Sequence, residues 1–358
     1  METYLKDQAD FSKINRVLVI KLQHLGDVLL TTPVFSALKQ QYPHLEIDAL
    51  VYSDTASLLT NNPEVNNIFC VDRAWKSQKL QKISHELTLF NTLKNRQYQL
   101  IICLTDRMRA AWLVRALQPA YSVAQKYPHK RGKFWRNSFS HLYSVPTQPR
   151  HTVEINLDAL RRIGVYPNQS KTPLSIYATI ETKQKTQTLL DHYKLHPNQY
   201  IVIHPTSRWM FKAWNTTGVS TLLNLLDRHN IKTVLVSGPD QKELEYAQKI
   251  IAQQSSCIDL SGQLTLPELS QLIANASCFI GLDSVAMHIA AAVHTPTVAL
   301  FGPSNDNIWH PWQVSHRILA GNFTCRPCGQ DGCGNGKISD CLQQITPQQV
   351  FDAVIELI

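Results

Sequence analysis

Four short segments carry the side chains that could perform chemistry, and each directly follows an apolar run. The first is "QHLGD" at 23–27, after the apolar run 17–20. Its Asp27 could act as a general base that takes a proton from an attacking hydroxyl. It could equally cap a helix, because a carboxylate at a helix start accepts hydrogen bonds from free backbone N–H groups. The segment has one glycine where a dinucleotide fingerprint needs three, which disfavours a Rossmann dehydrogenase.

The second segment, "HPTSRWMFKAWN" at 204–215, offers hydroxyls and cations beside aromatic side chains. A turn of this composition that leads into a helix could clamp a diphosphate, because cations and helix N-termini bind phosphate oxygens. An ordinary charged loop would have the same composition, so both interpretations stay open. The candidate residues are Thr206, Ser207, Arg208 and Lys212.

The third segment, "GLDSVAMHIAAA" at 281–292, places Asp283 and Ser284 at a predicted helix start. Free N–H groups at such a start form an anion site, and the small residues that follow let a ligand approach the backbone closely. His288 would lie about one turn further along the helix, although a lone histidine there is more often hydrogen-bonded packing.

The fourth segment, "SGPDQKE" at 237–243, contains Asp240 and Glu243. An acid at the end of a parallel strand commonly accepts hydrogen bonds from ribose hydroxyls. Helix capping by Asp240 is an equally weighted alternative.

Four of the eight cysteines are grouped in "CRPCGQDGCGNGKISDC" at 325–341. Closely spaced cysteines can form a tetrahedral zinc site that closes a loop poor in apolar residues. The usual pair of two-residue spacings is absent here, so zinc ranks behind reduced or opportunistically oxidised thiols. The residues concerned are Cys325, Cys328, Cys333 and Cys341.

The composition predicts a globular protein with two domains. Its 358 residues exceed the usual size of a single core, and 44% hydrophobic with 17% charged residues excludes a disordered chain. The polar start does not resemble a secretory signal. Asp283, His288 and His294 interrupt the most apolar stretch, 278–301, which argues against a spanning helix. We therefore expect a cytoplasmic protein.

The net charge of +8 favours an anionic partner. The segment 125–150 is rich in lysine and arginine and contains no acid. Such a run could simply be solvated, but Phe134 and Trp135 within it favour a binding surface.

Strand-like and helix-like patterns alternate along the chain, which predicts parallel sheets with crossover helices, an α/β fold. The expected strands are 16–21, 45–52, 67–71, 98–104, 200–205, 232–238, 278–282 and 297–302, and the expected helices are 27–41, 80–96, 107–117, 215–229, 240–253 and 347–358. Prolines and few helix signals at 164–182 indicate a linker. The domains are then 1–175 and 176–358, the second with a Cys-rich loop (321–341) and a terminal helix. Because ligands bind beyond the carboxyl ends of such strands, all four segments fall where a site is expected.

Three longer segments together resemble the bacterial heptosyltransferases that build the inner core of lipopolysaccharide, which form glycosyltransferase family 9. They are "VLVIKLQHLGDVLLTTPVFSALKQQYP", "HPTSRWMFKAW" and "FIGLDSVAMHIAAAVHTPTVALFGPS". The similarity runs from about residue 16 to 312, and the motifs are specific in combination.

This resemblance implies a GT-B fold, in which two Rossmann-like doubly wound domains face each other across a cleft. The N-terminal domain would bind the acceptor and the C-terminal domain the nucleotide sugar. It further implies an inverting transfer from ADP-L-glycero-β-D-manno-heptose to a heptose of the inner core, with no cofactor and no catalytic metal.

The resemblance also implies roles for individual residues. Asp27 would be the base and Lys212 the phosphate-binding lysine. The implied donor-binding residues are Thr206, Ser207, Arg208, Lys212, Asp240 or Glu243, Asp283, Ser284, Val285, Ala286 and His288. With the acceptor a phosphorylated lipid-linked sugar, the residues expected to bind it are Arg107, Arg109, Lys130, Arg131 and Lys133.

The expected partners are therefore ADP-heptose and a lipid-linked lipopolysaccharide core, with no nucleic acid. The expected location is cytoplasmic, peripheral at the inner face of the inner membrane. One alternative is another GT-B glycosyltransferase that uses a different nucleotide sugar. A second is a non-catalytic protein that binds nucleotides or nucleic acid through its basic face.

Overall fold

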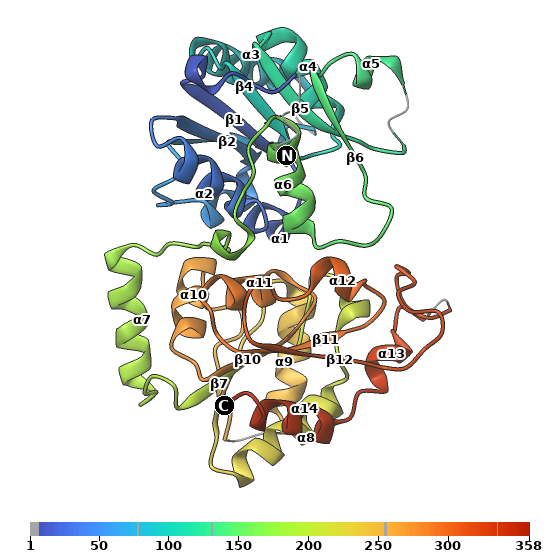
Figure 1. Cartoon of the computed structure of the whole chain (residues 1–358). Coiled ribbons are helices and arrows are strands. Elements are labelled where there is room, and N and C mark those ends of the chain that lie inside the picture. The colour runs from blue at the N-terminus through green and yellow to red at the C-terminus, as the bar shows by residue number, and fades with distance from the viewer. Residues whose placement is uncertain (1–6, 77–78, 130–131, 254–255, 335) are drawn as a thin grey trace. The chain divides into compact units, whose positions relative to one another are not determined.

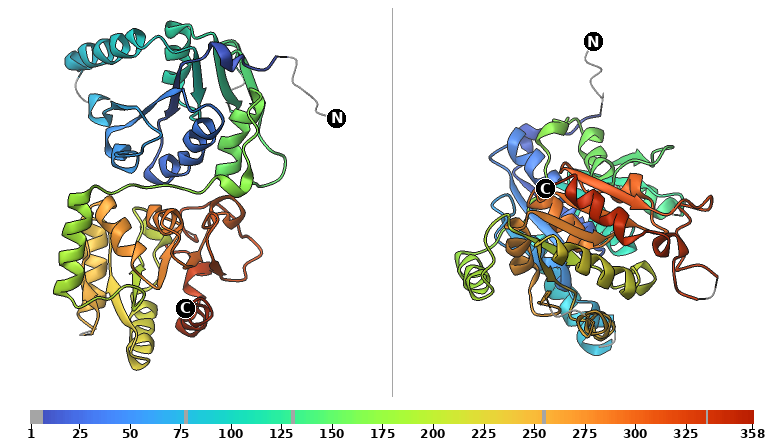
Figure 2. Two further views of the ribbon diagram at one scale, coloured as in Figure 1. Left: turned by 60° about the vertical axis from the view of Figure 1, so that its left-hand side comes forward. Right: turned by 90° about the horizontal axis from the view of Figure 1, so that it is seen from below.

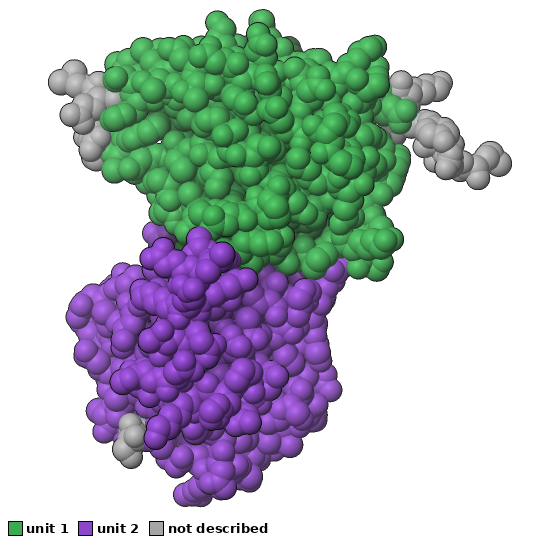
Figure 3. Space-filling model, turned by 90° about the vertical axis from the view of Figure 1, so that its left-hand side faces the viewer, with its two compact units in different colours: residues 1–177 green, residues 178–358 purple. Residues whose placement is uncertain are grey.

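The computed structural model describes residues 7–76, 79–129, 132–253, 256–334 and 336–358. The chain divides into two compact units, Met1–Tyr177 (unit 1) and Ala178–Ile358 (unit 2), which Figure 3 draws in different colours. The domain boundary expected at residues 175 and 176 lies two residues before this division.

Unit 1 is built on a six-stranded parallel sheet in the order β3-β2-β1-β4-β5-β6 (Figure 1). Its strands are β1 (Arg16–Lys21), β2 (Glu46–Tyr52), β3 (Asn67–Val71), β4 (Leu100–Cys103), β5 (Tyr121–Lys126) and β6 (His141–Ser144). Its helices are α1 (Leu25–Leu29), α2 (Thr32–Gln41), α3 (Lys79–Asn95), α4 (Met108–Leu117), α5 (Lys133–Arg136) and α6 (Thr152–Arg162), with 3-10 turns η1 (Phe11–Lys13), η2 (Ser53–Leu58), η3 (Arg73–Lys76) and η4 (Gln169–Lys171).

Unit 2 repeats this architecture with a sheet in the order β12-β11-β10-β7-β8-β9. Its strands are β7 (Tyr200–His204), β8 (Lys232–Leu235), β9 (Ile258–Asp259), β10 (Cys278–Leu282), β11 (Thr297–Phe301) and β12 (His316–Ala320). Its helices are α7 (Ile180–His192), α8 (Thr216–Arg228), α9 (Gln241–Ile251), α10 (Leu266–Ala274), α11 (Val285–Ala292), α12 (Asp306–Trp309), α13 (Asp340–Gln343) and α14 (Pro347–Ile355), with the 3-10 turn η5 (Met210–Lys212).

The central strands are apolar runs because both faces of each sheet are covered. All residues of β7, β10 and β11 are buried, as are all of β1 after its first residue. Strands covered on both faces read as continuous hydrophobic runs rather than as alternating ones. This confirms the α/β class and the doubly wound arrangement expected from the sequence.

The single helix expected at 27–41 is wrong, because the structure has two helices there. Helix α1 ends at Leu29, and α2 begins at Thr32 with Pro33 in its first turn. Proline lacks the backbone N–H that a continuous helix would need at that position, so the chain stops and starts again.

Several elements were not expected. They include the strands β5, β6, β9 and β12 and the helices α6 and α10, while α7 starts inside the segment expected to be a linker. Within the described residues, no helix is both long enough and apolar enough to cross a membrane.

Candidate functional site

In each sheet the strand order reverses at one point, and ligands of doubly wound folds bind beyond the carboxyl ends of the strands at that point. In unit 1 the reversal lies between β1 and β4, and in unit 2 between β10 and β7. A ligand site is therefore expected at the loops that leave β1 and β4 in unit 1, and β10 and β7 in unit 2.

In unit 1 the loop after β1 carries Asp27 on the short helix α1. This helix begins at Leu25, two residues earlier than the sequence suggested, and its N-cap residue is His24. Asp27 is thus in the first turn, and its Oδ2 accepts a hydrogen bond from the backbone N–H of His24 at 3.3 Å. The other oxygen, Oδ1, lies 3.8 Å from the Lys21 ammonium. Asp27 can cap α1 and also act as a base, because only Oδ2 accepts the capping hydrogen bond, whereas Oδ1 lies beside Lys21.

Lys21, the last residue of β1, is a residue of this site that the motifs did not indicate. Its side chain is 6% exposed and that of Asp27 is 19% exposed, so the ammonium lies beneath the carboxylate. Burial lowers the pKa of Lys21, while the nearby Asp27, Cys103 and Asp106 act in the opposite direction. A lysine that ends an otherwise apolar strand, as in "VLVIK", is the signal that could have revealed it, since lysines are rarely buried without a partner.

Neighbouring strands hold the Asp27 loop in place. Arg73 donates from Nη2 to the Gln23 carbonyl at 2.8 Å, and its guanidinium lies 3.7 Å from the centroid of the Tyr52 ring. On the other side, the Thr105 hydroxyl donates to the Leu22 carbonyl at 3.4 Å. The loop is thus tied to η3, which follows β3, and to the segment that follows β4, and these contacts fix the direction of α1.

The residues expected to bind the acceptor occupy different surroundings. Arg107 is the N-cap residue of α4, with Nε 4.0 Å from Asp106, and Lys133 is exposed on α5. Arg109 forms an ion pair with Glu86 of α3 at 2.5 Å, so its charge is already matched. Lys130 and Arg131 lie outside the described residues. The acceptor role of this set stays a prediction.

In unit 2 an ion pair joins the two loops at the strand reversal. Lys212, at the end of η5 in the loop after β7, places Nζ 2.6 Å from Oδ2 of Asp283, which follows β10. Their side chains are 20% and 10% exposed. An ammonium group has three N–H donors, so Lys212 can hold Asp283 and still donate to a ligand oxygen. The predicted cation and the predicted acid are thus brought together.

A second contact joins the loop after β7 to the loop after β8. The Thr206 hydroxyl donates to Glu243 Oε2 at 2.6 Å, and the Gly238 N–H donates to the same oxygen at 3.2 Å. Asp240 is the N-cap of α9, where it accepts from the Lys242 N–H at 3.0 Å. Capping therefore occupies Asp240, whereas Glu243 is buried and accepts the hydrogen bond from Thr206, a predicted site residue. Ribose binding by either acid stays a prediction.

The remaining residues of the 204–215 segment differ in burial. Ser207 is buried, and its hydroxyl accepts from the Trp209 N–H at 3.3 Å. Arg208 is exposed, with its guanidinium 5.8 Å from the centroid of the half-exposed Trp209 ring. Trp214 anchors the segment, since its buried indole donates to the Ile345 carbonyl at 3.2 Å.

Helix α11 presents its N-terminus at the same place. Its N-cap residue, Ser284, has an extended backbone and makes no side-chain cap, and its buried hydroxyl oxygen has no partner in the structure. The N–H groups of the first helical residues, Val285 and Ala286, have no partner within the helix, as at any helix start, and such groups can bind an anion; Ala286 is buried. His288 is buried one turn along, with its ring 6.5 Å from that of Trp309.

The buried His204 at the end of β7 is expected to make the stability of the fold depend on pH. Burial lowers the pKa of His204 from its ordinary value of 6.5, against the opposing charge of Glu243, and its Nδ1 lies 3.0 Å from the Thr206 carbonyl. The folded protein therefore binds fewer protons at this ring than the unfolded one. Stability should fall as the pH drops below about 6.5, because the unfolded state takes up the proton first.

We expect the melting temperature to fall less in His204→Gln than in the wild type between about pH 7.5 and about pH 5.5. Glutamine can still donate to Thr206 but does not titrate. Thermal unfolding of both proteins, with His196→Gln at an exposed position as the control, measures the difference. If the melting temperature changed with pH in the same way in all three proteins, His204 would not be the source of the pH dependence.

The grouped cysteines do not assemble a metal site in this structure. All eight cysteines are free thiols, and in the part of the chain that the structure describes no three metal-ligating side chains of His, Cys, Asp or Glu come together. Cys341 is buried, whereas Cys325 is exposed. Arg326, inside this segment, donates from Nε to the Gly302 carbonyl at 2.7 Å, which ties the segment to the turn after β11.

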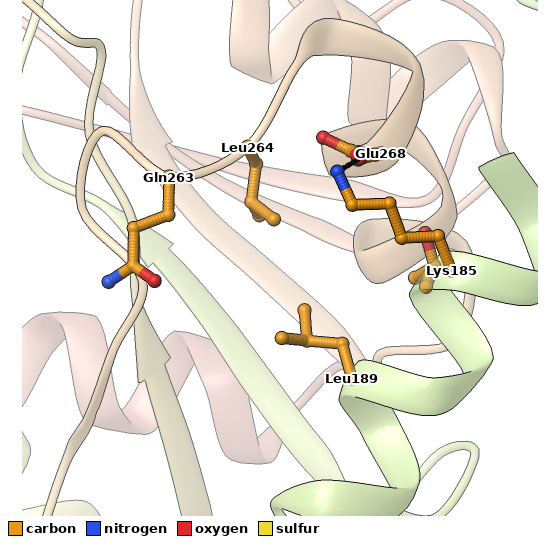
Figure 4. Close-up of a pocket in the computed structure, with 6 residues that line it drawn as sticks. Lys185, Leu189, Gln263, Leu264 and Glu268 are labelled. Carbon is orange, nitrogen blue, oxygen red and sulfur yellow. Dashed lines mark ion pairs between the residues drawn. The ribbon is translucent and has the colours of Figure 1, made fainter.

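A separate pocket of about 200 Å³ lies between α7 and the segment leading into α10 (Figure 4). Lys185 and Glu268 form an ion pair at 2.5 Å on its wall. The other lining residues are Thr186, Leu189, Gln263 and Leu264. None of the predicted site residues lines it.

Comparison with known proteins assigns the chain to a family. The family model described as "Glycosyltransferase family 9 (heptosyltransferase)" matches residues 87–339. The chain belongs to glycosyltransferase family 9. As a member of that family it is a glycosyltransferase, and the resemblance noted from its motifs is confirmed.

Curated relatives and solved structures agree with this membership in family 9. "Lipopolysaccharide heptosyltransferase 3" of Escherichia coli is 40% identical over 305 residues, which covers 84% of this chain and 88% of that protein. A family 9 glycosyltransferase from Veillonella parvula superposes with a TM-score of 0.83 at 22% identity, over 96% of this chain and 97% of that one. The E. coli heptosyltransferase WaaC with ADP gives 0.76 at 19% identity, over 96% and 100%. These similarities confirm the GT-B fold expected from the motifs.

Proposed function

We propose that this family 9 enzyme transfers L-glycero-D-manno-heptose from ADP-heptose to a heptose of the lipopolysaccharide inner core, with inversion at the anomeric carbon. The relative at 40% identity carries the name of a lipopolysaccharide heptosyltransferase, and solved relatives include WaaC with ADP. The observation that carries the proposal is the pairing of Lys212 with Asp283 beside the N-terminus of α11, at the strand reversal of unit 2.

In unit 1, Asp27 acts as the general base. The acceptor hydroxyl attacks the anomeric carbon while its proton passes to the Asp27 carboxylate, and the bond from that carbon to the phosphate oxygen breaks. The buried Lys21 ammonium and the His24 N–H hold the two carboxylate oxygens in place. A fixed base removes the proton as the new bond forms, so the hydroxyl need not ionise beforehand.

In unit 2, positive groups take up the charge that develops on the departing ADP. Lys212 and the first N–H groups of α11 are preorganised donors, and such donors stabilise charge without reorganising during the reaction. Ser284 supplies a buried hydroxyl for a ligand oxygen. The Thr206–Glu243 contact holds the loop that positions Lys212.

The acceptor in this proposal is lipid-linked and lies at the inner face of the inner membrane, where the enzyme works as a peripheral protein. Arg107 and Lys133 are the described cations that would bind its anionic groups.

Nucleotide selectivity tests the proposal directly. We expect ADP to raise the melting temperature, since a ligand at about 100 times its Kd stabilises the folded state by about 2.7 kcal/mol. UDP and GDP at the same concentration should shift it much less. The matching assay follows release of ADP from ADP-heptose in the presence of a truncated core acceptor.

Two other outcomes of this experiment would each point to a different function. Stabilisation by UDP or GDP in place of ADP would indicate a different nucleotide sugar. Stabilisation by ADP without any turnover would indicate a nucleotide-binding protein that is not a transferase.

A further inference from the structure

Two neighbouring helices of unit 1 expose large apolar side chains that nothing in the reaction requires. On α3, Ile83 is 65% exposed and Leu87 55%, and on α4, Trp112 is 62% exposed and Met108 38%. Within each helix the two residues are four apart, so each pair lies on one face. Large apolar side chains that gather in one place on a surface mark an interaction site more often than scattered ones do.

The two pairs belong to one surface. Glu86 of α3 and Arg109 of α4 form an ion pair between the helices, and each is flanked in sequence by the exposed apolar residues of its own helix. Figure 1 shows α3 and α4 at the same end of unit 1, and in both views of Figure 2 α3 lies at its margin. The α3–α4 face is defined here as Ile83, Leu87, Met108 and Trp112.

Basic side chains border this face. The ring of Phe134 in α5 lies 4.5 Å from that of Trp112 and 4.6 Å from the Arg115 guanidinium, so α5, which also carries the exposed Lys133 and Arg136, packs beside Trp112. Lys94 is exposed near the end of α3. The sequence from 107 to 153 contains no acid, and Arg109 balances Glu86. The border is therefore positive.

We propose that the α3–α4 face docks on the surface of an anionic lipid bilayer. Aliphatic side chains and a tryptophan bordered by lysine and arginine match the chemistry of a lipid interface, where apolar groups enter the acyl boundary and cations meet the headgroups. Nucleic acid fits less well, because Trp112 alone of the four side chains offers a ring on which a base can stack. The inference rests on the proposed function, since it names the surface by which the enzyme reaches a lipid-linked acceptor.

Vesicle sedimentation of the full-length protein tests the proposal. The probes are vesicles of phosphatidylcholine with phosphatidylglycerol and vesicles of phosphatidylcholine alone, without any acceptor. We expect binding to the anionic vesicles that weakens with salt, and a loss of about tenfold or more in Leu87→Gln/Trp112→Gln. The matched control, Ile180→Gln/Ile355→Gln, replaces two exposed isoleucines of unit 2 and should bind as the wild type does.

A second variant, Lys94→Gln/Arg136→Gln, tests the positive border. It should reduce binding to anionic vesicles and leave any binding to neutral vesicles unchanged. Equal vesicle binding by the wild type and Leu87→Gln/Trp112→Gln would overturn the proposal, as would an equal loss in the unit 2 control. Binding of an oligonucleotide or a protein that depends on Leu87 and Trp112, without vesicle binding, would also overturn it.

Turnover on a water-soluble truncated acceptor tests the proposed function without requiring the enzyme to bind a membrane. We expect Leu87→Gln/Trp112→Gln to retain wild-type turnover on that acceptor. Vesicle binding without turnover in the wild type would contradict the proposed function alone, and turnover without vesicle binding would contradict only the docking surface.

Discussion

Asp27→Asn is expected to lower kcat for heptose transfer about a thousandfold, because a positioned general base typically contributes a factor of about 10² to 10⁴. The asparagine carbonyl can still accept the hydrogen bond from the His24 N–H, so α1 should keep its start. What the variant loses is the group that accepts the proton. Steady-state turnover of ADP-heptose on a truncated core acceptor measures the effect.

The donor should bind Asp27→Asn normally, since the predicted donor residues all belong to unit 2. Stabilisation by ADP is therefore expected to match the wild type, which shows that the variant is folded. Asp10→Asn is the matched control, because Asp10 also caps a helical turn in unit 1, through the Ser12 N–H at 3.2 Å, and has no proposed role in the reaction. Near-normal kcat in Asp27→Asn would remove this residue from the chemistry.

Much of the fold could be predicted because its central strands are buried on both faces. The bounds of the central strands β1 and β10 agree with the sequence prediction at 16–21 and 278–282. Strands of this kind are continuous apolar runs between polar turns, which is the clearest strand signal in a single sequence. The edge strand β6, "HLYS", is half polar and lacks that signal. Its pairing with β5, rather than its own pattern, makes it a strand.

Some residues of the candidate site could likewise be predicted from the sequence, and others could not. Asp27, Lys212 and Asp283 could be predicted because each lies in the polar segment that follows an apolar run, and the carboxyl ends of parallel strands meet at one edge of a sheet. The pattern "VLVIK" could have revealed Lys21 as a buried lysine, but the contacts that support Asp27 could not be predicted. Lys21 and Arg73 act through distances to Asp27 and Gln23 that only the folded chain defines. No local pattern in the sequence encodes these contacts.

Lys212 is the group expected to contribute most to stabilising the negative charge that develops on the departing diphosphate. Lys212→Met should lower kcat/KM for ADP-heptose about a hundredfold to a thousandfold, the range found when a preorganised donor to a developing negative charge is removed. Methionine keeps most of the length of the side chain, so the loop after β7 should remain packed. The control is Lys242→Met, an exposed lysine of α9 that makes no side-chain contact proposed for catalysis.

A second consequence follows from the ion pair between Lys212 and Asp283. Without the ammonium, the carboxylate of Asp283, only 10% exposed, would face the donor phosphates with no opposing charge. Removing one partner of a largely buried pair costs more than the pair contributes, because the remaining charge is left uncompensated. The KM for ADP-heptose should therefore rise further in Lys212→Met than in Lys212→Met/Asp283→Asn.

In the double variant kcat should stay low, because neither methionine nor asparagine supplies the positive charge that the leaving group needs. Partial recovery of KM without recovery of kcat would separate the two effects, repulsion in the ground state and stabilisation of the transition state. If the double variant binds the donor no better than the single one, Asp283 does not face the phosphates. If Lys212→Met keeps wild-type kcat, the positive charge comes from elsewhere, and the N-terminus of α11 becomes the next group to test.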